Sequence, residues 1–144
     1  MGATLKVRPH LHENDRSATG YLPAAAFEAM AEAFFADPDH SQRGWGTAHD
    51  AQARILRETR PALAVEAEGD VLIVGHGAVG SLLYCALSGR PISRQHDQPA
   101  GGGNFWEFER AHEAVIRGWT PIEVLQQSGH CAPCRPRSVS PDRR

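Results

Sequence analysis

The turn Gly75-His76-Gly77 is the part of the sequence whose residue types and spacing best fit chemistry. It follows an apolar run at 70–74 and precedes a segment of helical composition, so we expect a strand to lead directly into a helix. Such a helix directs its unpaired N–H groups and the positive end of its dipole back at the turn. An imidazole at this place can donate a hydrogen bond to a phosphoryl oxygen. The sequence therefore predicts an anion site around His76.

Two other interpretations of this turn are open. The glycines can make a tight connection in which His76 is an incidental side chain. Gly75, Gly77 and Gly80 also match the dinucleotide-binding pattern G-x-G-x-x-G. His76 is bulky where a pyrophosphate must approach, and the acidic residue at a suitable distance, Asp97, lies in a Pro- and Gly-rich loop rather than at a strand end. Dinucleotide binding is therefore the less favoured interpretation.

A second polar cluster, His-Leu-His-Glu-Asn-Asp-Arg, occupies residues 10–16. Glu13 is of interest because a carboxyl group beside a phosphate pocket can act as a general acid on a leaving oxygen. His10 and His12 would share one face of an extended chain, but an H-x-H pattern alone indicates metal binding only weakly. We favour exposed polar residues at these two positions and predict no metal site.

The elements expected to position these groups follow from local patterns. Helices are expected at 22–36, 48–60 and 78–87, and strands at 4–7, 70–74, 104–109 and 114–119. Thr47 is expected to cap the second helix, which Pro61 then kinks or restarts. The strand at 70–74 has the composition of a strand buried on both faces in a parallel sheet. Arg54 on the second helix is expected to lie largely in water.

Length and composition limit the remaining choices. The chain has 144 residues and a formal net charge of −2, so we expect one domain at 1–127 and no general attraction to nucleic acid or membranes. A Pro- and Arg-rich tail at 128–144 is expected to be disordered. Cys131 and Cys134 with His130 supply three of the four ligands of a structural zinc site, and an incidental tail motif is favoured. Few cysteines and no signal peptide favour the cytoplasm.

Several stretches taken in order resemble the histidine phosphatase (phosphoglycerate mutase-like) superfamily. They are LHENDRSATGYLP, VLIVGHGAVGSLLYCALSGRPI, RQHDQPAGGGNFWEF and IRGWTPI, and the similarity covers about residues 7–122. The resemblance implies a three-layer α/β/α sandwich around a mostly parallel sheet. It also implies hydrolysis or transfer of a phosphoryl group from a phosphomonoester through a phosphohistidine, with no metal or organic cofactor.

The resemblance assigns roles to particular residues. His76 matches the histidine that stabilises the transferring phosphoryl group, and Glu13 matches the carboxylate that protonates the leaving group. Substrate binding is expected from Gly75, Gly77, Ala78, Arg16 and Asn104. Asp97 and Gln98 are secondary candidates for substrate selection, because their loop should approach the turn at 75–77.

The sequence departs from the family in one important respect. The family's nucleophilic histidine belongs to an N-terminal R-H-G motif, which occurs nowhere in this chain. His10 is a poor substitute, because it lies too close to Glu13 in the sequence. The missing segment would include a central strand, so we expect a hydrophobic edge beside 71–74 that favours self-association or completion by a partner. An N-terminally truncated phosphatase and a non-catalytic domain that binds a phosphorylated ligand are the two functions considered.

Overall fold

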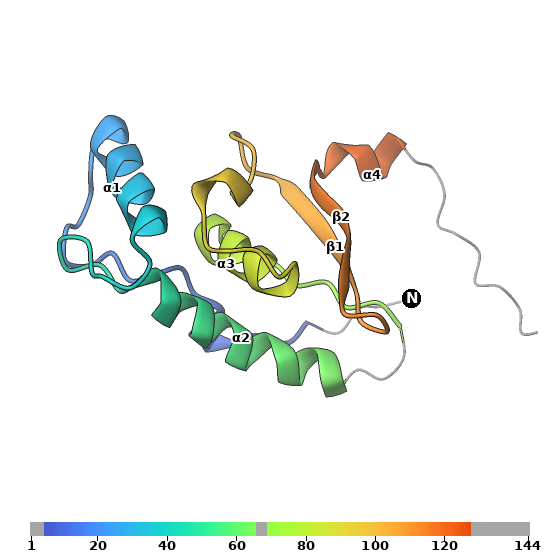
Figure 1. Cartoon of the computed structure of the whole chain (residues 1–144). Helices are drawn as coiled ribbons and strands as arrows, with labels where there is room; N and C mark the ends of the chain where they lie inside the picture. Colours follow the sequence, from blue (N-terminus) through green and yellow to red (C-terminus); the bar gives the residue numbers. More distant parts are fainter. Residues whose placement is uncertain (1–4, 66–68, 128–144) are drawn as a thin grey trace, which may run out of the picture.

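Three packed helices and a β-hairpin make up most of the fold. The computed structural model describes residues 5–65 and 69–127 (Figure 1). The α-helices are α1 (Ala24–Ala36), α2 (Ala48–Val65), α3 (Gly77–Leu87) and α4 (Glu123–Gln127); the strands are β1 (Asn104–Glu109) and β2 (Ala114–Pro121). Two short 3-10 helices complete the list: η1 (Pro9–Leu11) precedes α1, and η2 (Arg94–His96) lies between α3 and β1. The predicted tail at 128–144, with Cys131 and Cys134, lies outside the described residues.

The core lies where α1, α2 and α3 meet. In Figure 1, α3 lies along α2, α1 stands at one end of the pair and the hairpin at the other. The side chain of Gln52 in α2 donates a 2.9 Å hydrogen bond to the carbonyl of Leu82 in α3. The buried apolar cluster draws on all three helices and the loop before α2: Met30, Phe34, Phe35, Trp45, Ala48, Ala51, Ile55, Val79, Leu82 and Leu83.

Most helix predictions are confirmed, because their signals are local. The apolar face expected of the first helix is buried at Met30, Ala31, Phe34 and Phe35. Thr47 caps α2, since its Oγ1 accepts a 3.0 Å hydrogen bond from the N–H of Asp50. Pro61 does not restart the helix, because α2 continues through it to Val65. Pro61 is exposed, so the carbonyl that its missing N–H leaves unbonded can be hydrated.

The mixed α/β character is confirmed, but the expected sheet is not formed by the described residues. Strands β1 and β2 make a two-stranded antiparallel sheet, with Phe105 opposite Thr120 and Glu107 opposite Arg117. This hairpin matches the two strands predicted at 104–109 and 114–119. The mostly parallel sheet of a three-layer sandwich is absent from the described part of the chain.

The two other predicted strands are wrong in the described structure. Residues 5–7 and 70–74 have no regular secondary structure, and Leu72 and Val74 are exposed rather than buried. A strand buried on both faces needs neighbouring strands to bond its backbone and cover its side chains. The described chain supplies no such neighbour. The apolar side chains of Leu72, Ile73 and Val74 are exposed as expected, but they do not lie at the edge of a sheet.

Candidate functional site

Glu13 lies at the N-terminus of α3, although the two are more than sixty residues apart in the sequence. The turn of η1 leads into the loop that carries Glu13. One carboxylate oxygen, Oε1, accepts hydrogen bonds from the N–H of Val79, at 3.2 Å, and of Asn14, at 3.1 Å. The carboxylate thus caps a helix whose N-cap residue, His76, makes no side-chain cap of its own. Glu13 and the turn at 75–77 form one site.

The turn at 75–77 leads into a helix as the sequence predicts, although no strand precedes it among the described residues. His76 is extended, with φ −97° and ψ 162°, and its carbonyl accepts the first hydrogen bond of α3, from Gly80 N–H at 3.0 Å. Its side chain is exposed and forms no hydrogen bond or ion pair among the described residues. A Cβ atom at Gly77 would collide with the amide end of the Gln98 side chain, which would have to move to make room.

A cavity of about 520 Å³ opens beside this turn. Of the residues predicted for the site, Glu13, Arg16, Gly77 and Ala78 line it. Gly75, His76 and Asn104 do not. Its other walls come from α1, from Trp45 and from the loop 94–102. The structure therefore brings four of the seven predicted residues around one cavity. His76 directly precedes one of them, Gly77, in the chain.

Asn104 supports the loop beside the cavity rather than lining it. Its Nδ2 donates to the carbonyls of Pro99, at 3.1 Å, and Gly102, at 3.2 Å. Asp97 and Gln98, the secondary candidates, do line the cavity. Asp97 Oδ1 accepts a hydrogen bond from Ser81 Oγ in α3 at 2.5 Å. The expectation that this loop approaches the turn is confirmed.

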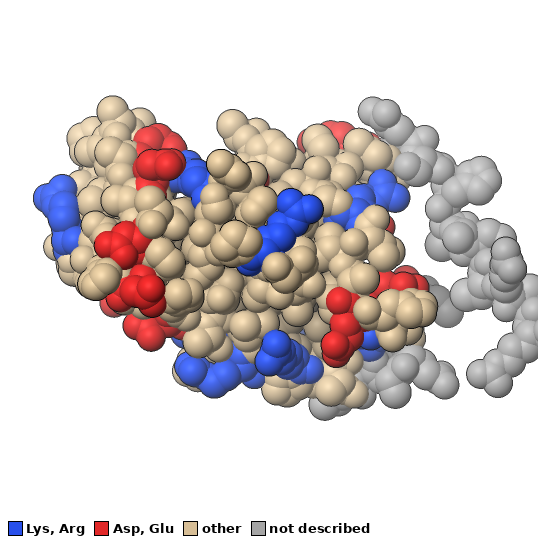
Figure 2. Space-filling view, in the orientation of Figure 1, with Lys and Arg blue, Asp and Glu red and all other residues tan. Residues whose placement is uncertain are grey.

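The charges that line the cavity are partly compensated. Arg94 pairs with Glu28 at 2.6 Å and with Asp97 at 3.1 Å. Arg16 forms no ion pair in the described part of the chain, and its guanidinium group lies 5.2 Å from the ring centre of Phe27. Figure 2 shows no continuous basic surface on this face of the molecule. A cation without a carboxylate partner is thus available at Arg16.

Asn14 is a site residue that sequence analysis missed. It is only 5% exposed and lines the cavity, and its Nδ2 is a buried polar atom with no hydrogen-bond partner among the described residues. Buried donors of this kind normally find an acceptor. An oxygen atom of a bound ligand would supply one.

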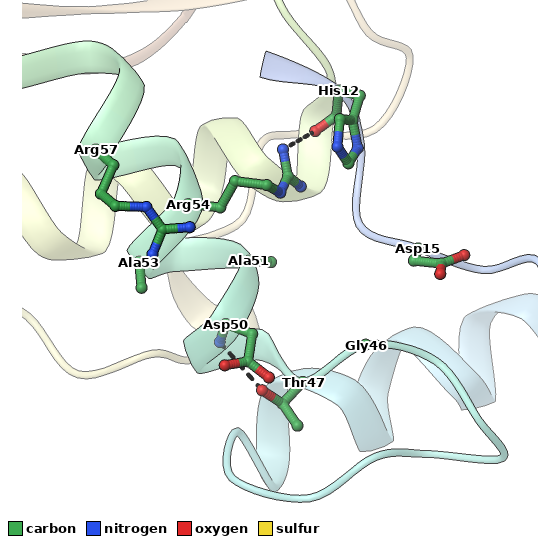
Figure 3. Close-up of a pocket in the computed structure, with 9 residues that line it drawn as sticks. All are labelled: His12, Asp15, Gly46, Thr47, Asp50, Ala51, Ala53, Arg54 and Arg57. Carbon is green, nitrogen blue, oxygen red and sulfur yellow. Dashed lines mark hydrogen bonds between the residues drawn. The ribbon is translucent and has the colours of Figure 1, made fainter. Parts of the chain in front are cut away.

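Arg54 is the second residue that was missed, and its predicted position in water is wrong. Its guanidinium group donates three hydrogen bonds to carbonyls of the Glu13 loop: to His10 at 2.6 Å, to His12 at 2.8 Å and to Glu13 at 3.1 Å. Figure 3 shows the side chain reaching from α2 to this loop, beside a smaller cavity of about 270 Å³. Burial lowers the pKa of Arg54, and the nearby Glu13 carboxylate opposes that shift.

The histidines of the loop have ordinary surroundings. His10 is exposed and does not line the larger cavity. The ring of His12 lies 2.7 Å, through Nδ1, from the carbonyl oxygen of Glu13. Within residues 5–65 and 69–127, no three His, Cys, Asp or Glu side chains are grouped so that they could hold a metal ion. None of the helices in these residues is long and apolar enough to cross a membrane.

The family model of the histidine phosphatase superfamily (branch 1) matches residues 1–117. The chain belongs to the histidine phosphatase superfamily. The match includes every segment that lines the larger cavity: the Glu13 loop, the turn at 75–77 and the loop 94–102. A search of curated proteins finds no significant match.

Membership of the histidine phosphatase superfamily supports a phosphatase-like function in general terms. The dinucleotide interpretation loses its structural basis, because the G-x-G-x-x-G pattern needs a strand–helix–strand unit around it. The described residues before the turn form no strand, and those after α3 form an antiparallel hairpin.

Proposed function

We propose that the larger cavity binds the phosphoryl group of a phosphomonoester at the N-terminus of α3. The observation that carries the proposal is the hydrogen bond from Val79 N–H to Glu13, because it holds a candidate acid at a helix start. Gly77 and Ala78 line the cavity, and the N–H groups of these two residues have no partner in the described part of the chain. They are available to phosphoryl oxygens, together with Asn14 Nδ2 and Arg16.

Each group then has a chemical role in phosphatase-type turnover. A nucleophile attacks phosphorus, the bond to the leaving oxygen breaks, and the protonated Glu13 donates its proton to that oxygen. His76, exposed at the edge of the turn, donates a hydrogen bond to the phosphoryl group as negative charge accumulates on it. In the superfamily the nucleophile is a histidine, and water resolves the phosphohistidine. The proposed chemistry requires no metal or organic cofactor.

A second candidate function is binding of a phosphorylated ligand without turnover. The absence of an R-H-G motif from the sequence favours it. His10, the other histidine considered as a nucleophile, does not line the larger cavity. The phosphohistidine mechanism is therefore proposed for the lineage of this chain, and phosphate binding for the chain itself. We also propose a cytoplasmic location, because the chain has only three cysteines. The family implies a three-layer sandwich, of which residues 5–65 and 69–127 form only the helices and a two-stranded sheet.

Hydrolysis of an aryl phosphate tests the catalytic proposal. The rates of the unaltered chain, Glu13→Gln and His76→Ala are compared with two controls at exposed positions outside the cavity, Glu32→Gln and His112→Ala. Turnover that both site variants lose and both controls keep supports an assembled catalytic site. Turnover that is unchanged in Glu13→Gln contradicts the role of this residue as the acid.

Calorimetric titration with inorganic phosphate separates the two candidates. Binding without turnover, weakened in Arg16→Ala and kept in both controls, identifies a phosphate-binding domain. If the chain neither binds phosphate nor turns over the ester, both candidate functions are wrong.

A further inference from the structure

The segment between α2 and α3 exposes an unusual amount of apolar surface. Leu72 is 85% exposed, Val74 79% and Ile73 36%. Isolated apolar residues are common on protein surfaces, but a contiguous apolar stretch marks an interaction site. No function proposed above uses these side chains.

The backbone N–H and C=O groups of the same segment are also unpaired among the described residues. None of the N–H or C=O groups of residues 70–75 has a hydrogen-bond partner in the described structure. The sequence of this segment, Asp-Val-Leu-Ile-Val-Gly, is rich in β-branched residues that favour strands. Segments that combine apolar side chains with unpaired backbone groups associate by adding a strand.

We propose that residues 70–76 pair with the same residues of a second copy of this chain, as an antiparallel two-stranded ribbon. The segment is complementary to itself when the two-fold axis passes through Ile73. Leu72 of one copy then lies opposite Val74 of the other. At both ends of the ribbon, Asp70 lies opposite His76.

Charge selects this arrangement over the parallel one. Asp70 and His76 are both exposed, and neither forms an ion pair in the described part of the chain. A parallel ribbon in register places Asp70 beside Asp70, which is unfavourable. The antiparallel ribbon separates the two carboxylates and gives each an imidazole partner. A two-fold interface also closes on itself, so the product is a dimer and not a filament.

Sedimentation velocity at increasing protein concentration tests the dimer. Leu72→Lys is compared with the matched control Leu125→Lys, which alters another exposed leucine, 52% exposed, in α4. Because Leu72 is exposed, its replacement leaves the fold intact, which circular dichroism verifies. The substitution enters a two-fold interface twice, so we expect the dissociation constant to rise by about tenfold or more. The control is expected to behave as the unaltered chain does.

A cross-link tests the register. Ile73→Cys, in a background with Cys131→Ser and Cys134→Ser, should form a disulfide-linked dimer on mild oxidation, because residues on the axis of an antiparallel pair face each other at disulfide distance. Ile122→Cys, half-exposed beyond the hairpin, should not.

Three outcomes overturn the proposal. One is a monomer at every concentration. Another is an equal effect of Leu72→Lys and Leu125→Lys. The third is association that Leu5→Lys abolishes and Leu72→Lys does not, since this would assign the interface to the exposed N-terminal segment. The ribbon and the proposed phosphate site share His76, so the substitutions that test the ribbon are placed at Leu72 and Ile73, which the phosphate site does not use. Sedimentation and phosphate titration of these variants can therefore fail separately.

Discussion

Arg54→Met is expected to loosen the loop that carries Glu13. Arg54 is the contact that ties this loop to α2 through three hydrogen bonds to carbonyls. A hydrogen bond with a charged partner contributes about 1.5–3 kcal/mol, but the released carbonyls regain water, so we expect a net loss of about 2 kcal/mol in the free energy of unfolding. If the free energy of unfolding falls by about 2 kcal/mol per molar of urea, the urea concentration at the midpoint of unfolding falls by roughly 1 M.

Equilibrium denaturation in urea measures this loss, and Arg57→Met is the matched control. Arg57 lies one turn further along α2, is exposed, and forms no hydrogen bond or ion pair among the described residues. Its replacement is expected to change the free energy of unfolding by less than about 0.5 kcal/mol. Amide exchange should also become faster at residues 12–16 in Arg54→Met alone. Equal effects of the two substitutions would refute the assignment of Arg54 as the residue that positions the loop.

Three further predictions concern the cavity and the core. Glu13→Gln is expected to raise the affinity for inorganic phosphate severalfold in calorimetry while it removes any turnover, because the carboxylate competes with phosphate for the start of α3; weaker phosphate binding would contradict this. Gly77→Ala is expected to lower the free energy of unfolding by about 1 kcal/mol, because the new Cβ atom collides with Gln98. Adding Gln98→Ala should restore the free energy of unfolding measured by urea denaturation, because it removes the collision. Additive losses from the two substitutions would show that no collision exists. Burial raises the pKa of the Cys85 thiol, so less thiolate is present at any given pH. Iodoacetamide should therefore label Cys85, detected in its proteolytic peptide, only when the chain is unfolded in urea. Labelling of Cys85 in the folded chain would contradict its burial.

The helices and the hairpin could be predicted because their signals are contained in short stretches of sequence. The apolar face of α1 and the Thr47 cap of α2 each depend on residues within one or two turns. The strand predicted at 70–74 failed for the opposite reason. Its composition favours a strand, but a strand exists only beside another strand, and the partner is a non-local property.

The candidate site was predicted in part for a related reason. The family resemblance identifies Glu13 and the turn at 75–77, and the fold brings them together. Arg54 was missed because its role is to bond backbone carbonyls some forty residues away, which no residue pattern records. A weak signal did exist, since Arg54 follows the buried Ala51 by three positions and precedes the buried Ile55 by one, at the edge of the buried helix face.

The charges around the cavity connect phosphate binding to the proposed acid. Three carboxylates and two guanidinium groups line it, and Arg94 is already paired with two of the carboxylates, Glu28 and Asp97. Among the described residues that line the cavity, only the guanidinium group of Arg16 is left to balance a phosphate dianion. A phosphate dianion that accepts hydrogen bonds from the N–H groups of Gly77 and Ala78 would lie beside the Glu13 carboxylate, which the N–H of Val79 holds.

In the proposed mechanism, this neighbouring carboxylate is the group that gives its proton to the leaving oxygen. The contact that caps α3 in the free chain therefore also keeps Glu13 beside the proposed position of the phosphoryl group. A phosphate dianion and a carboxylate repel each other, so we expect bound phosphate to weaken the hydrogen bond between Val79 N–H and Glu13. A ligand without the phosphoryl charge should leave this hydrogen bond in place.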